Sequence, residues 1–267
     1  MTTFKELSDM SGRRVLITGG AGYLGRIMAE TLAELGAFIV LLDRPGARFG
    51  SIQSDLMHQW KASCLCIECD LESEEDRNSA IQEIKSDGIG LNCLINNAAF
   101  GGTTALEGWV TSFETQSLET WRRALEVNLT APFHFSQAFA PELKVAKGGN
   151  IINITSIYGE HGPDWRLYEG TEMGNPAAYA ASKGGLVQLT RWLATTLAPE
   201  IRVNAISPGG IFRNQPKVFF ERYVSKTPLN RMATEDDFRG VFAYLASDQS
   251  NYVSGQVISV DGGWGVW

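Results

Sequence analysis

Seven short apolar runs separated by helical patterns constrain the fold of this chain more than any other feature. The runs lie at residues 13–18, 38–43, 64–70, 92–99, 150–156, 201–207 and 256–260. Each run is continuously apolar rather than alternating with polar residues, as expected for strands that are buried on both faces of a sheet. Repeated strand and helix units of this kind predict an α/β fold, in which one doubly wound parallel sheet of about seven strands carries helices on both faces.

The helical patterns between the runs have clear ends, and nothing divides the chain into separate units. A pattern that begins at Tyr23 ends at Gly36, and one from Ala177 to Ala198 ends at Pro199. The 267 residues contain no linker or low-complexity segment. We therefore expect residues 1–267 to form a single domain.

Composition and charge argue against two classes of partner. The chain has a formal net charge of −7, whereas proteins that bind nucleic acids usually carry a basic face. Its apolar runs are far shorter than the roughly 20 residues that cross a bilayer, and the first residues contain no apolar signal core. We expect a cytoplasmic protein that binds neither nucleic acid nor membrane.

Three of the four cysteines, Cys64, Cys66 and Cys69, lie within one apolar run. They allow either a metal site or a buried strand with Cys64 and Cys66 on one face. No paired Cys or His cluster completes a zinc-binding set, so we favour the strand and expect no metal. Free thiols fit a reducing compartment.

A glycine-rich turn follows the first run. Gly20, Gly22 and Gly25 have the G-x-G-x-x-G spacing between a strand and a helix, which lets backbone N–H groups approach a pyrophosphate. Asp43 ends the second run, 18 residues beyond Gly25, where an acid can accept hydrogen bonds from the adenosine ribose. Its carboxylate would repel the extra phosphate of NADP, whereas Arg44 would attract it. We favour NAD because Asp43 holds the position at the strand end.

Five motifs, in this order, resemble the short-chain dehydrogenase/reductase family, classical type, over nearly the whole chain. They are "TGGAGYLG" (18–25), "NNAA" (96–99), "VNL" (127–129), "YAASK" (179–183) and "SPGG" (207–210). The closing "VSGQVISVDGG" is similar to the family's usual C-terminal strand. The resemblance implies a Rossmann-type fold, a nicotinamide cofactor and chemistry between an alcohol and a carbonyl group.

The resemblance also implies a catalytic set of four residues, Asn128, Ser156, Tyr179 and Lys183. Tyr179 and Lys183 are four residues apart, so they share a helix face. A free tyrosine has a pKa near 10, and we expect the ammonium and the positive nicotinamide to lower the pKa of Tyr179 so that it exchanges protons near neutral pH. By resemblance, Ser156 hydrogen-bonds the reacting oxygen, Lys183 also holds the nicotinamide ribose, and Asn128 holds a water in the proton relay.

Further cofactor contacts follow from the resemblance, and two positions depart from the family's pattern. The expected contacts are Gly19, Gly22, Tyr23, Leu24, Gly25, Asp43, Asp70, Leu71, Asn97, Ala98, Tyr179, Lys183, Pro208, Gly209 and Ile211. Tyr23 stands where classical members usually have a glycine, a spacing that matches the extended branch of epimerases and dehydratases. Arg213 stands where the family often has a threonine that contacts the nicotinamide amide, so its guanidinium could serve an anionic substrate instead.

Long segments after the strand ends are expected to border the substrate, because this architecture binds ligands at the carboxyl ends of its strands. Ser156 and Tyr179 lie 23 positions apart, a longer separation than is usual in the family, so we expect an insert near 157–175. A second insert is expected near 100–121, and a substrate-side segment near 211–232. The alternative for the inserts is surface decoration. The candidate substrate residues are Ser156, His161, Trp165, Arg166, Tyr168 and Arg213.

These residues favour a polar, sugar-like substrate, because aromatic faces pack on sugar rings while charged and amide groups bind hydroxyls. A phosphate or carboxylate would suit Arg213 and Arg222. We expect an NAD(P)-dependent alcohol dehydrogenase or carbonyl reductase. One alternative is a sugar-nucleotide epimerase or dehydratase, which would turn over with no net change in nicotinamide absorbance. The other is a non-catalytic dinucleotide sensor, which would bind the cofactor and turn over no substrate.

The assembly is predicted from exposed apolar residues and from the resemblance. The helix 177–198 carries apolar residues on more than one face, among them Leu186, Leu189, Trp192 and Leu193. The last residues, "GWGVW", add two tryptophans that we expect to pack against a neighbouring subunit rather than face water. We therefore expect a homo-tetramer.

Overall fold

The seven apolar runs form seven strands of one sheet. The computed structural model describes residues 2–101 and 104–267, so residues 102–103 of the expected insert at 100–121 lie outside the described part. The strands are parallel and stand in the order β3-β2-β1-β4-β5-β6-β7. Their bounds are Arg14–Thr18 (β1), Phe38–Asp43 (β2), Cys64–Glu68 (β3), Cys93–Asn96 (β4), Asn150–Ile154 (β5), Arg202–Pro208 (β6) and Val257–Val260 (β7). The predicted fold class is confirmed.

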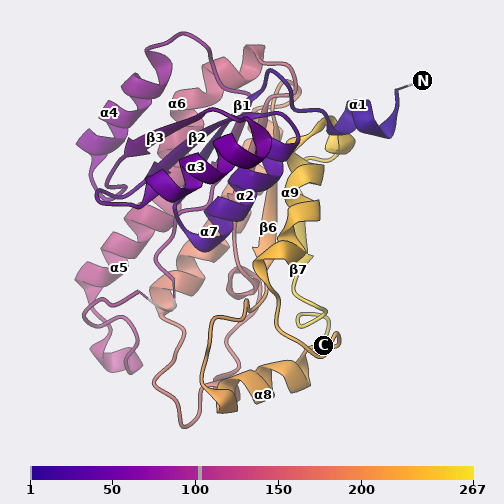
Figure 1. Ribbon diagram of the computed structural model, residues 1–267. Helices are drawn as coiled ribbons and strands as arrows, with labels where there is room; N and C mark the ends of the chain where they lie inside the picture. Colours follow the sequence, from indigo (N-terminus) through magenta and orange to yellow (C-terminus); the bar gives the residue numbers. More distant parts are fainter. Residues whose placement is uncertain (1, 102–103) are drawn as a thin grey trace.

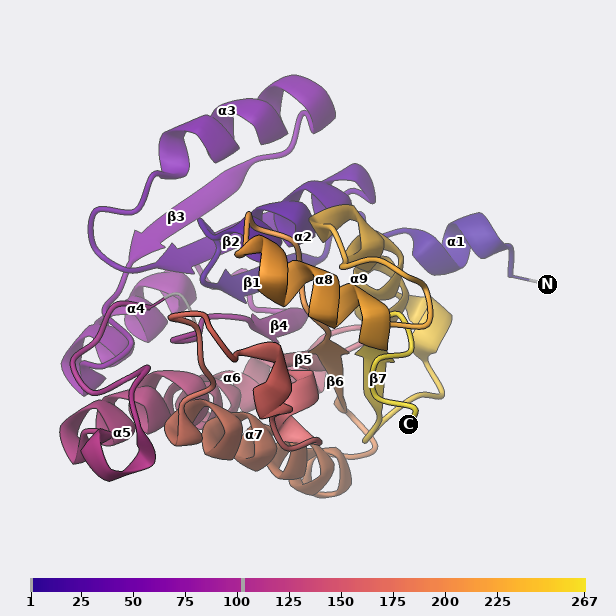
Figure 2. The same ribbon diagram turned by 90° about the horizontal axis from the view of Figure 1, so that it is seen from below.

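Helices cover both faces of this sheet (Figure 1). One face carries α2 (Tyr23–Glu34), α3 (Phe49–Trp60) and α9 (Arg239–Ala246), and the other carries α4 (Glu74–Lys85), α6 (Ala131–Val145) and α7 (Ala177–Thr196). A further helix, α5 (Leu118–Leu125), packs on α7. The short α1 (Phe4–Ser8) lies near the N-terminus, and α8 (Lys217–Lys226) lies beyond the end of the sheet, apart from both helical layers (Figures 1 and 2).

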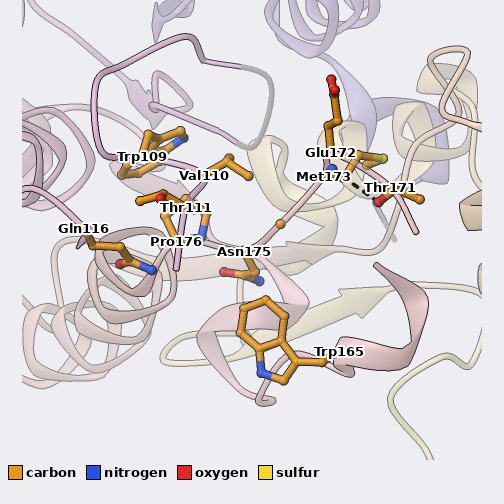
Figure 3. A pocket seen from close by; sticks show the side chains of 11 residues that line it. Trp109, Val110, Thr111, Gln116, Trp165, Thr171, Glu172, Met173, Asn175 and Pro176 are labelled. Atoms are coloured by element: carbon orange, nitrogen blue, oxygen red, sulfur yellow. Dashed lines mark hydrogen bonds between the residues drawn. The ribbon is translucent and has the colours of Figure 1, made fainter. Parts of the chain in front are cut away.

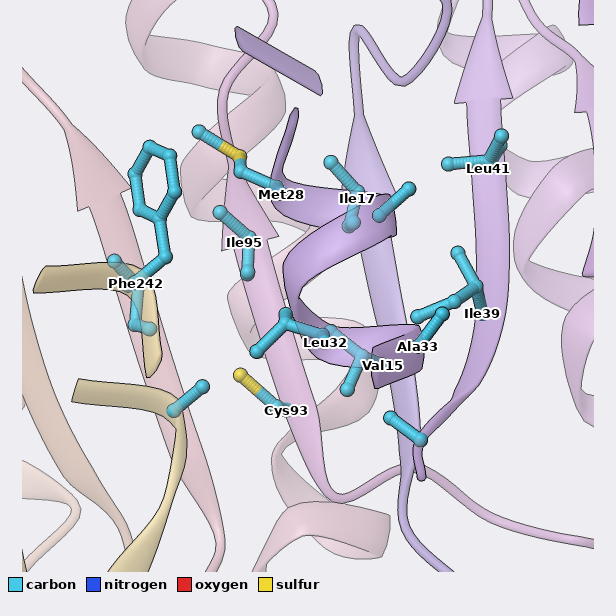
Figure 4. Packing of buried hydrophobic residues seen from close by; sticks show 14 of the residues in the cluster. Val15, Ile17, Met28, Leu32, Ala33, Ile39, Leu41, Cys93, Ile95 and Phe242 are labelled. Atoms are coloured by element: carbon cyan, nitrogen blue, oxygen red, sulfur yellow. The ribbon is translucent and has the colours of Figure 1, made fainter. Parts of the chain in front are cut away.

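Alternate residues of each central strand supply the two cores. On β1, Val15 and Ile17 belong to the cluster beneath α2, α3 and α9, whereas Leu16 belongs to the cluster beneath α4, α6 and α7. Figure 4 shows the first cluster, in which Leu32 of α2 and Phe242 of α9 lie over the strands. A strand that is buried on both faces has no polar side to display, which explains the continuous apolar runs in the sequence.

Helix ends follow local chemistry. The Ser73 hydroxyl accepts a hydrogen bond from the Asp76 N–H and so caps the start of α4. Gly36 follows α2 with a φ of 96°, a left-handed conformation that favours glycine. The predicted end of α7 at Ala198 is two residues too long, because the helix ends at Thr196. Leu197 and Ala198 therefore lie between the end of this helix and Pro199.

A third cluster of buried residues lies beyond the sheet and consists mainly of aromatic side chains. Its members are Ile157, Leu167, Tyr168, Phe219, Tyr223, Met232 and Trp264. They come from the segments after β5, β6 and β7, so loops far apart in the sequence share one small core. We call it the aromatic cluster. It holds α8 and the C-terminal segment together at the carboxyl end of the sheet.

The aromatic cluster corrects the expectation for the C-terminal tryptophans. Trp264 is 2% exposed, and its ring stacks on Tyr223 with 6.0 Å between the ring centroids. This chain therefore covers Trp264 by itself and needs no neighbouring subunit to do so. Trp267 is exposed. On α7, Leu186 and Leu193 are buried in this chain, whereas Trp192 is 54% exposed.

The cysteine-rich run forms β3 at one edge of the sheet. Cys64 and Cys66 share a face, with 3.7 Å between their sulfur atoms, and are partly rather than fully buried. Among the described residues, no group of three or more His, Cys, Asp or Glu side chains is arranged to hold a metal ion. Across the same residues, every helix is too short or too polar to traverse a lipid bilayer.

Candidate active site

The glycine turn after β1 is built so tightly that two of its positions have no room for a side chain. Gly19 has a φ of 64°, and a Cβ on it would lie 2.8 Å from the Ala98 Cα. A Cβ on Gly25 would lie 2.2 Å from the Gly19 carbonyl oxygen. Gly22 is the N-cap of α2, and its nearest neighbour would be 3.3 Å from a Cβ. The packing of the protein therefore requires a glycine at positions 19 and 25 more strictly than at position 22.

The ends of β1 and β4 are joined by hydrogen bonds beside this turn. The Thr18 hydroxyl accepts from the backbone N–H groups of Asn97 and Ala98, at 3.0 and 3.1 Å. The Asn97 amide donates to the carbonyl oxygens of Thr18 and Gly19, at 2.9 and 3.0 Å. The strand order reverses between β1 and β4, and in open α/β sheets ligands bind at such a switch point. Thr18 was missed as a site residue, although it precedes the glycine turn directly.

Acidic residues follow β2 and β3 at the same edge of the sheet. The Asp43 carboxylate accepts from the Ala21 N–H at 2.9 Å, so it lies against the glycine turn. Asp70 is exposed and accepts from the Glu72 N–H, while Leu71 is buried. Within the described residues, no protein acceptor pairs with the N–H groups of Tyr23, Leu24 and Gly25 in the first turn of α2. A glycine-rich turn, a free helix N-terminus and an acid at the end of β2 fit a dinucleotide.

Ser156, Tyr179 and Lys183 meet just beyond the carboxyl end of β5. Lys183 is buried in α7, and its ammonium donates to the Ile154 carbonyl oxygen at 2.7 Å. Its Nζ lies 5.9 Å from the centre of the Tyr179 ring. Ser156 is the N-cap of the 3₁₀ helix η3 (Ile157–Gly159), where its hydroxyl accepts from the Tyr158 N–H. The predicted helix face for Tyr179 and Lys183 is confirmed.

Burial sets the titration of both catalytic candidates on α7. It lowers the pKa of Lys183 to about 7. It also raises the pKa of Tyr179, against smaller lowering effects of the Ser156 hydroxyl and the Arg213 charge. In the protein alone, the pKa of Tyr179 is therefore raised rather than lowered, because burial outweighs these two effects. The expected lowering also relies on the positive nicotinamide and stays a prediction for the complex with the cofactor. A lysine that titrates near pH 7 is suited to passing protons at neutral pH.

Asn128 lies in a π-helical turn, Glu126–Thr130, between α5 and α6. Its side chain is occupied by protein partners. The amide oxygen accepts from the Phe100 N–H at 2.8 Å, and the amide nitrogen donates to the Phe100 carbonyl and to the Ser182 hydroxyl. Such π turns occur frequently at functional sites. Asn128 thereby ties the segment after β4 to the helix that carries Tyr179.

The predicted cofactor residues after β6 lie against β7 and the segment before α9. A Cβ on Gly209 would lie 2.7 Å from the Asp261 Cα, and its N–H donates to the Val260 carbonyl at 3.0 Å. Pro208 ends β6. Ile211 forms a parallel bridge with Ala233. This segment is thus held in place on its way from β6 to α8.

The two inserts together form a cavity of about 260 Å³ (Figure 3). Its lining residues are Trp109, Val110, Thr111, Gln116, Trp165, Thr171, Glu172, Met173, Gly174, Asn175 and Pro176. Pro176 is the N-cap of α7 and its carbonyl oxygen accepts from the Tyr179 N–H, so the cavity adjoins the helix that carries Tyr179. Both side-chain polar atoms of Asn175 are buried without a hydrogen-bond partner among the described residues. Among the described residues that line it, Glu172 is the only charged one.

The structure brings only one of the four candidates from the 157–175 insert to this cavity, namely Trp165. His161 lies against the Trp264 ring, with 6.0 Å between centroids. Arg166 is exposed and pairs with Asp164 at 2.8 Å. Tyr168 is buried in the aromatic cluster, and its hydroxyl hydrogen-bonds the Tyr158 hydroxyl at 2.6 Å. Asn175 was missed because a single asparagine before a proline resembles any loop residue.

Arg213 does not line this cavity. Its guanidinium carbon lies 4.4 Å from the centre of the Tyr23 ring, and its Nε donates to the Glu235 carboxylate at 3.1 Å. Arg222 donates to the Glu169 carbonyl oxygen. The sequence suggested that Arg213 and Arg222 form one anion site, but the two arginines do not converge on a common site.

Comparison with known proteins identifies the family. Residues 20–265 match the family model described as "Enoyl-(Acyl carrier protein) reductase". A tropinone reductase homolog of Arabidopsis thaliana is 34% identical over 277 residues, covering 100% of this chain and 97% of its own. A protein named probable galactose dehydrogenase, from Rhizobium meliloti, is 32% identical and covers 97% of each chain.

Solved structures agree. A gluconate 5-dehydrogenase from Burkholderia cenocepacia, in complex with NADP and tartrate, has a TM-score of 0.86 at 26% identity, with 99% and 100% of the two chains covered. An NAD⁺-bound xylitol dehydrogenase has a TM-score of 0.83 at 28% identity, with 95% and 99% covered. Together with the glycine turn, the Ser156, Tyr179 and Lys183 arrangement and the sheet order, these matches show that the chain belongs to the short-chain dehydrogenase/reductase family of oxidoreductases, which use nicotinamide cofactors.

Proposed function

We propose that the protein is an NAD-dependent dehydrogenase or reductase that acts on an alcohol or carbonyl carbon of a polar, sugar-like compound. The observation that carries the proposal is the convergence of Ser156, Tyr179 and Lys183 at the end of β5, next to a turn that fits a dinucleotide. A bound nicotinamide supplies or accepts the hydride. The work of the protein is then to orient the substrate and to move one proton.

The proton moves through Tyr179 in this proposal. Its phenolic hydroxyl exchanges a proton with the substrate oxygen, and the Ser156 hydroxyl holds that oxygen by a hydrogen bond. Lys183 binds the nicotinamide ribose and, with a pKa of about 7, returns the proton through the relay. Asn128 holds the segment after β4 in place, and we assign to its neighbourhood the water that completes the relay.

Asp43 is the basis for proposing NAD rather than NADP. Its carboxylate is fixed at the end of β2 by the Ala21 N–H. Asp43→Ala should raise KM for NAD about tenfold, because a hydrogen bond to a charged group contributes ~1.5–3 kcal/mol, and it should shift the ratio of kcat/KM towards NADP. Steady-state kinetics with both cofactors measures the shift. A wild-type kcat/KM that is higher for NADP would contradict the proposal.

The cavity between the inserts supports the substrate class. The side-chain amide of Asn175, which interacts with the Tyr168 hydroxyl, has two N–H donors and a carbonyl acceptor, and within the described residues neither of its polar atoms makes a hydrogen bond of ordinary geometry. Buried polar groups left unpaired are costly, so a ligand in the cavity that pairs with this amide would be favoured. Trp165 is 57% exposed and offers an aromatic face. Two threonines and Gln116 add further hydrogen-bonding groups, while Glu172 disfavours an anion. An uncharged hydroxylated part of the substrate suits this lining better than a phosphate or carboxylate does.

The test is a substrate panel of xylitol, galactose and gluconate with the matching keto compounds, followed at the nicotinamide absorbance band. We expect turnover of an uncharged member and about a tenfold higher KM in Asn175→Leu, which loses both hydrogen bonds. NADH affinity should not change. Asn251→Leu, an exposed position, is the control. If the enzyme turned over apolar ketones but no hydroxylated compound, the proposed substrate class would be wrong.

For assembly we propose a homo-tetramer in the cytoplasm. The exposed Trp192 on α7 is the position at which we propose one interface. Light scattering of the wild type and of Trp192→Glu would test the proposal. A wild-type monomer at micromolar concentration would refute it.

A further inference from the structure

The two positions at which the sequence departs from its family, Tyr23 and Arg213, are in contact. The Arg213 guanidinium lies over the Tyr23 ring at 4.4 Å from its centre, within the range of a cation–π interaction. Tyr23 is the first residue of α2, directly after the glycine turn. Arg213 follows β6, on the segment that leads to α8. The contact therefore joins the start of the first crossover helix to the substrate side of the molecule.

The position of Arg213 is fixed by its own surroundings. The bridge between Ile211 and Ala233 and the hydrogen bond from the Phe212 N–H to the Ala233 carbonyl, at 2.8 Å, hold the backbone on one side. The Arg213 N–H donates to the Gln215 side chain at 2.7 Å on the other. The backbone of this segment is thus held in place, and the contacts with Tyr23 and Glu235 position the guanidinium.

The Arg213 guanidinium has hydrogen-bond donors that are not used within the described residues. Its Nε is used by Glu235 at 3.1 Å, but within the described residues its two terminal nitrogens donate to no protein acceptor. About a third of the side chain is exposed. A planar fork with two unused nitrogens, stacked on an aromatic ring, is well suited to bind a phosphate oxygen pair.

Electrostatics at this point also calls for an anion. The N-terminus of α2 carries the positive end of the helix dipole, and Gly22 supplies no side-chain cap. A guanidinium next to that end is unfavourable by itself. Glu235 offsets part of the charge from one side, while a pyrophosphate between the helix N-terminus and Arg213 would be attracted by both.

We propose that Tyr23 and Arg213 form a clasp over the pyrophosphate of the bound dinucleotide, in which Arg213 binds the phosphates and Tyr23 holds the guanidinium in place. The clasp must open for the cofactor to leave. Arg213 is thus a residue that governs cofactor affinity and release, in place of the substrate-anion role that the sequence suggested. The inference needs only dinucleotide binding, so it stands apart from the choice of substrate.

The experiment measures binding without substrate. The probes are NADH, ADP-ribose, which keeps the pyrophosphate but lacks nicotinamide, and adenosine, which lacks both. Affinities come from calorimetry and NADH release rates from stopped-flow fluorescence. Arg213→Gln should weaken NADH and ADP-ribose about tenfold or more, since charge-assisted bonds to a phosphate are lost. It should leave adenosine within twofold and speed NADH release by a similar factor.

Two matched controls separate the clasp from a general loss of charge or structure. Arg231→Gln removes another arginine that pairs with the same 3₁₀ helix, η5 (Glu235–Phe238), through Asp237 at 2.6 Å, and it should leave all three affinities unchanged. Tyr23→Leu should weaken NADH by about two- to fivefold, whereas Tyr23→Phe keeps the ring and should behave as wild type.

The proposal fails if Arg213→Gln binds ADP-ribose as the wild type does while its melting temperature is unchanged. It also fails if Arg231→Gln weakens the dinucleotides equally, since the effect would then be one of overall charge. An Arg213→Gln/Tyr23→Leu double variant that is weaker than Arg213→Gln alone by the full Tyr23→Leu factor would show two independent contacts rather than a clasp.

Discussion

The switch point between β1 and β4, termed the crevice, and the proposed substrate side beyond β5 and β6 are held together in different ways. The crevice depends on backbone groups and short side chains, such as the bonds of Thr18 and Asn97 and the contact of Gly25 with Gly19. The substrate side depends on large aromatic side chains in the aromatic cluster, some of which belong to α8. One region is defined by where side chains are absent, and the other by where they are bulky.

This difference indicates how the two regions can vary. A turn in which a Cβ would lie 2.2 Å from a carbonyl oxygen tolerates almost no substitution, so one cofactor geometry is maintained. An aromatic cluster can be repacked with residues of similar volume at modest cost. We therefore expect specificity to vary more readily on the proposed substrate side than at the glycine turn.

The largest expected effect is on the chemical step, which can be impaired without changing either region. Tyr179→Phe removes only a hydroxyl, so the crevice and the aromatic cluster should stay intact while kcat falls about 10²- to 10⁴-fold. NADH affinity from fluorescence titration should match that of the wild type. Turnover close to that of the wild type would remove Tyr179 from the mechanism.

A substitution in the aromatic cluster should damage one region and spare the other. Trp264→Ala removes a buried indole and should lower the free energy of unfolding by about 3–5 kcal/mol. It should raise the substrate KM while NADH affinity stays within twofold. Trp267→Ala, in the same tail but exposed, is the control. If Trp264→Ala weakens NADH as much as it weakens the substrate, the two regions are not independent; Trp264→Phe serves if the alanine variant does not fold.

The smallest expected effect concerns Lys183, which lies between the two regions. Its pKa is lowered from 10.5 to about 7 in the folded protein, so the unfolded chain binds the extra proton between these values. Wild-type stability should therefore gain from this residue as pH rises from about 7 to 10, and this gain should be absent in Lys183→Met.

Thermal melts of wild type and Lys183→Met at several pH values measure this contribution. The melting temperature of the variant minus that of the wild type should be largest near pH 6 to 7 and should decrease towards pH 10. A difference that does not change with pH would mean that the pKa of Lys183 is not lowered in the folded protein and is that of a lysine in solution.

The strands and the crevice could be predicted from the sequence because both depend on residues that are close together in the chain. Each strand is a continuous apolar run, and Gly19, Gly25 and Asp43 stand at fixed distances from strand ends. The pairing of Tyr179 with Lys183 follows from helical periodicity alone. Such features require no knowledge of which distant segments meet.

The substrate side could not be predicted in the same way, because its contacts join residues that are far apart in the chain. Tyr168 resembles a ligand-binding aromatic until Tyr158, Phe219 and Trp264 are placed around it. Asn175 carries no sequence signal, and the contact of Tyr23 with Arg213 depends on the path of the backbone after β6. The burial that raises the pKa of Tyr179 in the protein alone could not be predicted either, since burial is a property of the whole fold.

The π turn at Glu126–Thr130 has a consequence for helical phase. Its one extra residue lets α5 and α6 run as a nearly continuous rod while facing different neighbours, α5 towards α7 and α6 towards β4 and β5. Deleting one residue there would restore an ordinary α-helix and rotate everything on one side of it by about 100° relative to the other. Asn128 would then point away from Phe100, although every residue that touches the substrate would still be present in the chain.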